Sequence, residues 1–182
     1  HGYAFKSKYF QETGKYVLTS PGHFHLLGGF RKREGKEKYS TEIFDKRYLL
    51  RKNDIIIAMT EQGEGLLGST AIVPDSDKYL HNQRLGLVQN INLEKIYWKY
   101  IPLLLNEYKI RKDISNSSTG TKVKHTSPKR ILELKCQLPS LKVQKRIAHI
   151  TFAYDDLIEN NLKRIKLLEQ AAQNIYKEWF VH

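Results

Sequence analysis

Apolar residues recur at steps of three and four positions through residues 141–180, and no Gly or Pro interrupts this stretch. Such steps average about 3.5 residues, the repeat that keeps an apolar stripe facing a partner helix. The pattern therefore predicts one long helix that pairs as a coiled coil. Its predicted seam consists of Ile158, Asn161, Ile165, Leu168, Ala172, Ile175 and Trp179, and an upstream stripe of Ile147, Ile150, Tyr154 and Leu157 runs into it.

This helix cannot bury its stripe against itself, so we expect the protein to work within an assembly. Ser140 precedes the helix and is a candidate N-cap, because its hydroxyl can accept a hydrogen bond from a free amide of the first turn. Asn161 lies in the seam, where an amide can pair with its counterpart and fix the register at some loss of stability. A helix end that faces solvent is the alternative for this stretch.

The part of the chain before the helix carries short apolar runs between turn residues, which is typical of strands. We expect strands at residues 16–19, 55–59, 70–73 and 85–89. Three consecutive isoleucines from Ile55 suit a strand that is buried on both faces. A glycine-rich stretch separates the two central runs, so they are expected to form a hairpin or a pair of strands joined by a loop.

One helix is predicted in this part, at residues 94–112, where Pro102 marks a kink or an early turn. A polar loop at 115–127 follows, and the alternation at 131–138 predicts a last short strand with Cys136 as a buried thiol. The resulting fold class is α+β. A mixed α/β globule with a twisted, largely antiparallel sheet occupies residues 1–139, and the pairing helix occupies residues 140–182.

Charge narrows the class of partner. The 182 residues contain 31 Lys and Arg against 19 Asp and Glu, a formal net charge of +12. This excess favours a polyanion, nucleic acid before an anionic membrane, although a basic protein without such a partner is the alternative. A single cysteine excludes an internal disulfide and suits a reducing cytoplasm. No run of about 18 apolar residues is present, so we expect no membrane span.

Basic residues gather in two polar loops, where glycines and hydroxyls beside lysines let a backbone approach phosphates. A third stretch, residues 81–84, carries side chains that can address base edges: Arg suits guanine, and Asn or Gln suits adenine. Solvated loops without a ligand are the alternative. The candidate DNA-binding residues are Arg31, Lys32, Arg33, Lys36, Lys38, Gln62, His81, Asn82, Arg84, Lys122, Lys124 and His125.

Other motifs carry little chemistry. Residues 63–68 match the glycine spacing of a dinucleotide-binding loop, but the following residues favour a strand where that motif needs a helix. His23 and His25 would share one face of a strand, as a DNA-facing or surface pair, and the spacing shows no further metal ligand. We find no catalytic constellation, so we expect no catalytic residues, no metal and no cofactor.

Several strings, taken together and in order, resemble the specificity (S) subunit of type I restriction-modification enzymes. The likeness covers nearly the whole chain, and it corresponds to one target recognition domain followed by one conserved-region helix. The strings are residues 2–7, 53–60, 81–86, 120–121, 124–128, 138–141, 144–148, 155–161 and 176–181.

The resemblance implies a subunit without catalysis of its own. Its recognition domain reads one half of a split double-stranded DNA site. Its helix pairs with an equivalent helix, from a second copy or a sister half, and spaces two recognition domains. It also docks methyltransferase subunits, and the full complex adds a restriction subunit.

Only one recognition domain and one helix are present here, where a full S subunit has two of each. This departure predicts either a natural half-subunit that dimerises or a fragment of a longer chain. Two rival interpretations stay open. One is a recognition domain from a fused restriction-methylation enzyme, and the other is a coiled-coil scaffold that binds RNA or protein.

Overall fold

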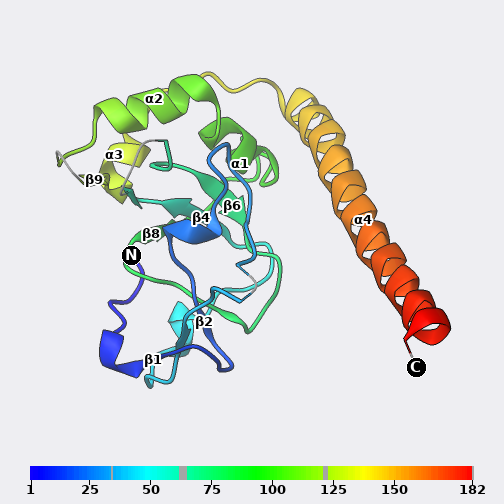
Figure 1. Cartoon of the computed structure of the whole chain (residues 1–182). Coiled ribbons are helices and arrows are strands. Elements are labelled where there is room, and N and C mark those ends of the chain that lie inside the picture. Colours follow the sequence, from blue (N-terminus) through cyan, green and yellow to red (C-terminus); the bar gives the residue numbers. More distant parts are fainter. Residues whose placement is uncertain (34, 62–64, 121–122, 182) are drawn as a thin grey trace. The chain divides into compact units, whose positions relative to one another are not determined.

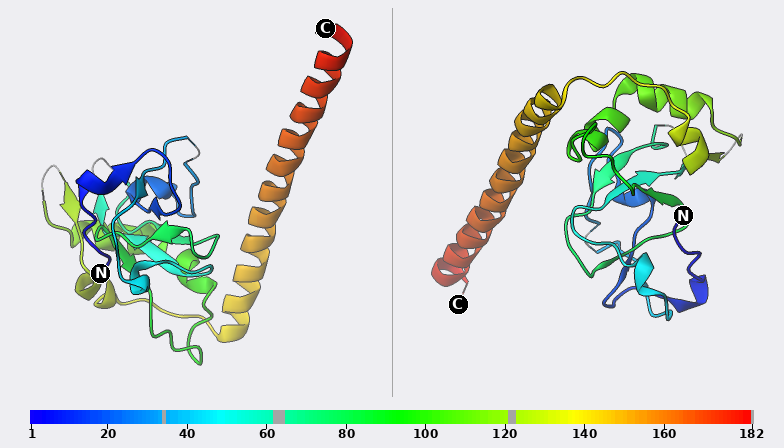
Figure 2. Two further views of the ribbon diagram at one scale, coloured as in Figure 1. Left: turned by 90° about the horizontal axis from the view of Figure 1, so that it is seen from below. Right: turned by 180° about the vertical axis from the view of Figure 1, so that it is seen from behind.

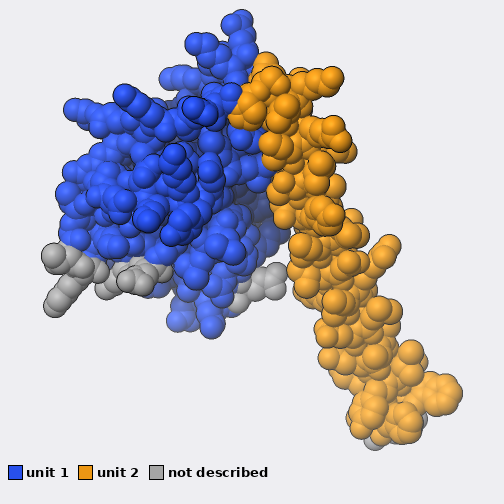
Figure 3. Space-filling view, turned by 90° about the horizontal axis from the view of Figure 1, so that it is seen from above, with its two compact units in different colours: residues 1–138 blue, residues 139–182 orange. Residues whose placement is uncertain are grey.

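The computed structural model describes residues 1–33, 35–61, 65–120 and 123–181. The chain divides into two compact units, His1–Leu138 and Pro139–His182, which Figure 3 colours separately. The first unit is a mixture of short strands and helices, and the second is one helix (Figure 1).

The first unit is built from short elements joined by turns. Its strands are β1 (Phe10–Gln11), β2 (Val17–Leu18), β3 (Tyr39–Ser40), β4 (Ile55–Ala58), β5 (Thr60–Glu61), β6 (Thr70–Ile72), β7 (Tyr79–Leu80), β8 (Leu85–Leu87) and β9 (Lys124–His125). Its helices are η1 (Ser7–Tyr9), η2 (Pro21–His23), η3 (Lys46–Tyr48), α1 (Tyr100–Leu105), α2 (Tyr108–Asn116) and α3 (Pro128–Leu132).

The strands form three small sheets in the orders β1-β3-β2-β7, β6-β4-β8 and β5-β9. Among the pairings between described strands, only that of β2 with β7 is parallel, so the predicted α+β class with largely antiparallel strands is confirmed. The right view of Figure 2 agrees with Figure 1 in placing α2 and β1 at opposite ends of this unit.

Strand β4 lies at the centre of the first unit because both of its faces are apolar. Ile56 and Ala58 belong to a core cluster with Val17 and Tyr79. Ile57 points to the opposite face, where it packs with residues of α2 in a second cluster. Alternation of side chains along a strand therefore gives β4 one core on each side, as its run of isoleucines predicts.

The predicted hairpin partner is also confirmed: β6 pairs antiparallel with β4, with Ile56 opposite Ala71. The strand that follows the glycine-rich stretch is β6, so the dinucleotide motif lacks the helix it requires. The side chain of Asn106 satisfies the free edge of β6. Its amide nitrogen donates to the carbonyl of Thr70 and its oxygen accepts from the Thr70 N–H, both at 2.9 Å.

Two predictions in this unit are wrong in part or whole. The helix expected at 94–112 is two helices, α1 and α2, and Pro102 lies inside the first. The strand expected at 131–138 does not form, and Cys136 is exposed. Helix α3 covers the start of that stretch instead, because Pro128 occupies its first turn and the hydroxyl of Ser127 accepts from Arg130 N at 3.4 Å.

The second unit is α4 (Leu141–Phe180), so the long helix is confirmed at the predicted residues. Ser140 occupies the N-cap position, but its side chain makes no capping hydrogen bond. None of the helices in the described parts of the chain is both long and apolar enough to cross a membrane.

Candidate nucleic-acid interface

A cleft of about 530 Å³ opens in the first unit beside η2, and four of the five described residues that line it are cationic. They belong to the first predicted basic loop, and Gly22 lies among them. The lining residues are Gly22, Arg31, Lys32, Arg33 and Lys36. The sequence predicts these charges in one loop, and in the structure the same residues line one concave surface.

Two short backbone hydrogen bonds are made by residues that line the cleft. The Arg31 N–H donates to the carbonyl of His23 at 2.8 Å, and the Lys36 N–H donates to the carbonyl of Arg33 at 2.7 Å. Gly22 leaves room for the Arg33 guanidinium, because a Cβ at this position would lie 2.9 Å from Arg33 Nη1. A larger residue at position 22 would therefore displace one of the cations that line the cleft.

Among the described residues that line the cleft, Lys32 has a carboxylate partner, and this ion pair is weak. Lys32 Nζ lies 3.8 Å from a carboxylate oxygen of Asp75, and both side chains are half exposed, a geometry that contributes little attraction in water. His23 adds no positive charge at neutral pH, because burial and the neighbouring Arg33 lower its pKa to about 4. The arginines and lysines thus supply the field that a phosphate would meet.

Lys38 belongs to the same loop but does not line this cleft. Its side chain is exposed, and its carbonyl accepts from Leu18 N at 2.7 Å, which fixes the loop against β2. The prediction of a shared strand face for His23 and His25 is wrong, because His23 lies in η2 with 1% of its surface exposed while His25 is exposed.

A second polar surface lies along one edge of the segment 55–61. Strand β8 pairs with β4 there, and β9 continues the same edge by pairing with β5. Met59 joins the two, because its N–H donates to the carbonyl of Arg84 at 3.0 Å and its carbonyl accepts from Thr126 N at 2.9 Å. Two predicted DNA-binding stretches that are far apart in sequence, 81–84 and 124–125, thereby become neighbours.

The residues on this edge differ in what they can offer a ligand. Arg84 and His125 are exposed, and Lys124 is half-buried. Asn82 accepts a hydrogen bond from Arg84 N at 3.1 Å, so its side-chain oxygen is used to shape the turn that presents Arg84. The predicted paired contact from Asn82 to adenine would have to share that oxygen.

His81 must be withdrawn from the candidate DNA contacts. Only 3% of its surface is exposed, its Nε2 lies 3.0 Å from the carbonyl of Leu85, and burial lowers its pKa. The ring therefore bridges the start of β8 from inside the protein and cannot reach a base edge. His81 lies between β7 and β8, and this position is what keeps its ring inside the protein.

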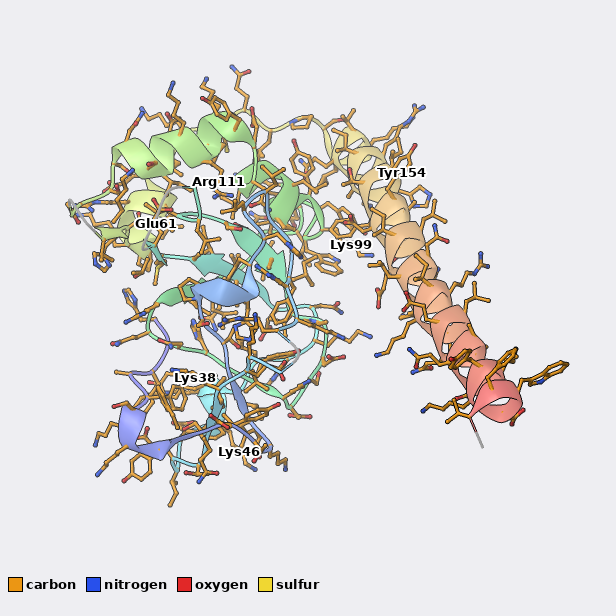
Figure 4. All side chains as sticks on the ribbon, in the orientation of Figure 1. Lys38, Lys46, Glu61, Lys99, Arg111 and Tyr154 are labelled. Atoms are coloured by element: carbon orange, nitrogen blue, oxygen red, sulfur yellow. The ribbon has the colours of Figure 1, made fainter. Side chains whose placement is uncertain are left out.

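Gln62 and Lys122 fall outside the described residues. Of their described neighbours, Glu61 is the last residue of β5 and Val123 immediately precedes β9. Figure 4 labels Lys38 and Glu61, which lie in different parts of the first unit. The described candidate DNA contacts thus fall into two main groups within one unit: the cationic cleft, and the edge formed by β8 and β9.

The sequence analysis does not predict the side chains that hold residues 65–67, which follow β5 in the chain. The buried carboxylate of Glu61 accepts from Leu66 N at 2.6 Å and also from Leu67 N. Arg111, from α2, donates to the carbonyls of Leu67 at 2.9 Å and Leu26 at 3.1 Å (Figure 4). The sequence spacing does not predict the two Arg111 contacts, because they join positions 44 and 85 residues apart.

The predicted seam residues of α4 are all exposed. Exposed fractions are 57% for Ile158, 51% for Ile165, 69% for Leu168 and 57% for Ile175. A row of large apolar side chains in water is a surface for another helix. As for metals, the described residues contain no group of three or more His, Cys, Asp or Glu arranged to hold an ion.

The family of the chain follows from comparison with known proteins. Residues 1–170 match the family model described as the type I restriction modification DNA specificity domain. The match covers most of the chain, so the protein belongs to this family. This is the family that the strings in the sequence resemble.

Curated relatives agree. The chain is 35% identical over 88 residues to the type I restriction enzyme MjaIX specificity subunit of Methanocaldococcus jannaschii, covering 48% of this chain and 19% of that protein. It is 26% identical over 162 residues to the MjaVIII specificity subunit of the same organism, covering 87% and 35%. The chain therefore spans well under half the length of the curated relatives it matches.

Solved structures show the same fold. The S subunit of the type I restriction-modification system from M. genitalium superposes with a TM-score of 0.63 at 17% identity, covering 93% of this chain and 39% of that one. The HsdS subunit from Thermoanaerobacter tengcongensis superposes with a TM-score of 0.56 at 16% identity, covering 94% and 44%. At such identities the likeness supports the fold alone.

Proposed function

We propose that this chain recognises one half of a bipartite double-stranded DNA target as the specificity component of a type I restriction-modification system. The observation that carries the proposal is the cationic cleft, found in a chain whose residues 1–170 match a DNA specificity domain. The family match favours this role over a coiled-coil scaffold, which charge alone would also allow.

The two polar groups divide the work of binding. Arg31, Lys32 and Lys36 surround a concave surface with exposed cations, which suits the sequence-independent phosphate backbone. Arg84 and His125 lie on the edge formed by β8 and β9, where exposed side chains can meet the edges of bases. The first group supplies affinity and register, and the second supplies discrimination.

Helix α4 pairs with an equivalent helix, in a second copy or a sister half, and thereby holds two recognition units apart. Methyltransferase subunits dock on the resulting assembly, and a restriction subunit completes it in the cytoplasm, where the chromosomal DNA lies. A solved structure that concerns complex assembly and conformational transition of the type I system shares the fold of this chain, with a TM-score of 0.54 at 15% identity. The exposed seam of α4 supports the proposed pairing.

A binding titration with charge variants tests the proposed division. The complete natural protein that contains this chain, with its methyltransferase partners, is titrated with labelled duplexes at several salt concentrations. The variant Arg31→Gln, Lys32→Gln, Lys36→Gln should weaken binding to every duplex. Up to three lost phosphate contacts should also flatten the slope of log affinity against log salt by up to about 3.

The matched control is Lys46→Gln, Lys52→Gln, Lys109→Gln, which removes the same charge from exposed positions that do not line the cleft. It should reduce the slope much less. Equal slopes in the two triple variants would show that net charge, and not the cleft, carries the electrostatic contribution. A complex that is insensitive to salt would contradict the DNA-binding proposal itself.

A further inference from the structure

His125 combines an exposed ring with a fixed frame. Its Nδ1 lies 3.1 Å from the hydroxyl oxygen of Thr60, which stands opposite it in the β5–β9 pair. Its N–H donates to the carbonyl of Thr119 at 2.8 Å, and its carbonyl accepts from Thr119 N at 3.0 Å. The backbone and the Nδ1 edge of the imidazole are therefore held, while Nε2, on the other edge of the exposed ring, has no hydrogen bond to a described residue.

The surrounding loop reinforces this frame. Arg130 Nη1 lies 3.3 Å from the hydroxyl of Thr119, and Thr126 N donates to the carbonyl of Met59. Gly120 adopts a φ of +100°, and a Cβ there would collide with the carbonyl oxygen of Val123. A side chain at position 120 would force the loop open, so the glycine keeps Thr119 against His125.

This rigidity distinguishes His125 from the lysines of the cationic cleft. A phosphate accepts a cation from many directions, so a flexible lysine is sufficient there. A base edge presents acceptors and donors in fixed positions, so a side chain that discriminates among bases must itself be fixed. A held imidazole on an exposed strand end meets that requirement.

We propose that His125 contacts a base edge directly, oriented by Thr60, and that its partner is a purine in the major groove. This inference rests on the proposed DNA-binding function. Thr60 is a positioning residue that acts through the imidazole. The structure thus separates one base-contacting residue from the phosphate-contacting group in the cleft.

The chemistry of the pair selects the class of base. When the Thr60 hydroxyl donates to Nδ1, the neutral imidazole carries its proton on Nε2, and a protonated imidazole also carries one there. Nε2 is then a donor in either form. Purines offer the N7 acceptor in the major groove and guanine adds O6, so guanine is the preferred partner.

The test is the methylated motif made in cells by the complete system with variant chains. Sequencing of methylated sites should show that His125→Gln and Thr60→Val each relax one purine position of one half-site by about 10-fold or more, within the usual cost of a lost base contact. Thr60→Ser keeps the hydroxyl and should restore the wild-type preference. Lys124→Gln should lower methylation at all sites without changing the motif.

Two matched controls exclude general damage. His25→Gln makes the same change at another exposed histidine, and Thr41→Val removes an exposed hydroxyl that donates to the carbonyl of Tyr9 at 3.3 Å. Both should leave the motif unchanged. An unaltered motif in both His125→Gln and Thr60→Val would overturn the inference and leave the proposed function standing.

If His125→Gln abolishes methylation altogether, His125→Asn and Thr60→Val decide the matter. Relaxation at one purine position in either variant supports the inference, and a wild-type motif or a general loss in both rejects it. A wild-type system that produces no methylated motif would instead refute the proposed function.

Discussion

The two units of this protein differ in how far they bury similar apolar side chains. In the first unit Ile56 is fully buried and Ile114 is 1% exposed, whereas in α4 Ile165 is 51% exposed and Leu168 is 69% exposed. Burying such a side chain contributes about 1.5–3 kcal/mol, so the first unit has already gained this stabilisation and α4 has not. The first unit buries its apolar residues in its own core, and we propose that the helix gains its remaining burial from a partner.

This difference suits a modular recognition protein. The core on both faces of β4 belongs to the unit that carries the cationic cleft and the edge of β8 and β9. We propose that the apolar seam of α4 pairs with a helix that carries a matching apolar pattern. Under the proposed function, recognition and spacing are encoded in separate parts of the sequence, which we expect to respond separately to mutation.

Charges placed in the seam should have the largest effect. Leu168→Glu with Ile175→Glu would bury carboxylates in a paired seam, at a cost of several kcal/mol, so pairing should be lost while the first unit stays folded. Light scattering measures the mass, and circular dichroism monitors the fold. Lys166→Glu with Gln173→Glu changes the same helix off the seam and should keep the assembly. An unchanged mass in the seam variant would contradict the pairing.

A cavity in the first unit should show the reverse behaviour. Ile114→Ala removes buried methyl groups from the core between α2 and β4, so the free energy of unfolding should fall by about 2–5 kcal/mol. The mass of the assembly should not change under folding conditions. Urea unfolding measures the loss. The control, Ile175→Ala, is tested below the concentration at which the helices pair, and it should lower the free energy of unfolding much less. Equal losses would remove the contrast between the units.

Acid should destabilise the first unit through His23. Its pKa is about 4 in the folded protein against an ordinary value of 6.5, so the unfolded chain binds an extra proton between these values. The associated stability is complete above pH 6.5 and is lost as the pH falls towards 4, by up to about 3 kcal/mol. Urea unfolding at pH 7 and pH 4.5 measures this loss.

The variant His23→Gln isolates this contribution. It should unfold more easily at pH 7, but its loss between pH 7 and pH 4.5 should be smaller than that of the wild type by up to about 3 kcal/mol. His81, whose pKa is lowered in the same direction by burial, remains in both proteins and cancels. The same pH dependence in both proteins would show that folding does not lower the pKa of His23.

Local patterns predicted the parts of the fold whose physics is local. The isoleucines of β4 and the uninterrupted stripe of α4 each satisfy one burial pattern over their full length, and both elements form as expected. The stretch 131–138 misled because a short alternation also fits one turn of helix followed by extended chain. Ser127 and Pro128 carried the correct signal, a cap and a first-turn proline.

The candidate site was predictable in composition but not in arrangement. The charges of Arg31 and Lys36 are visible in the sequence, and they do line one cleft. The burial of His81 and the contact between Thr60 and His125 depend on strand pairing, which joins residues 65 positions apart in the second case. The residue type alone does not predict that His81 is buried and His125 is exposed.

The most direct test of target selection by this chain is the pattern of DNA methylation in the host, sequenced with the gene that contains the chain intact, deleted and restored. We predict that deletion removes one bipartite methylated motif and that restoration returns it. A methylome that is identical in all three strains, while the methyltransferase partners are expressed, would contradict the claim that this chain selects a DNA target.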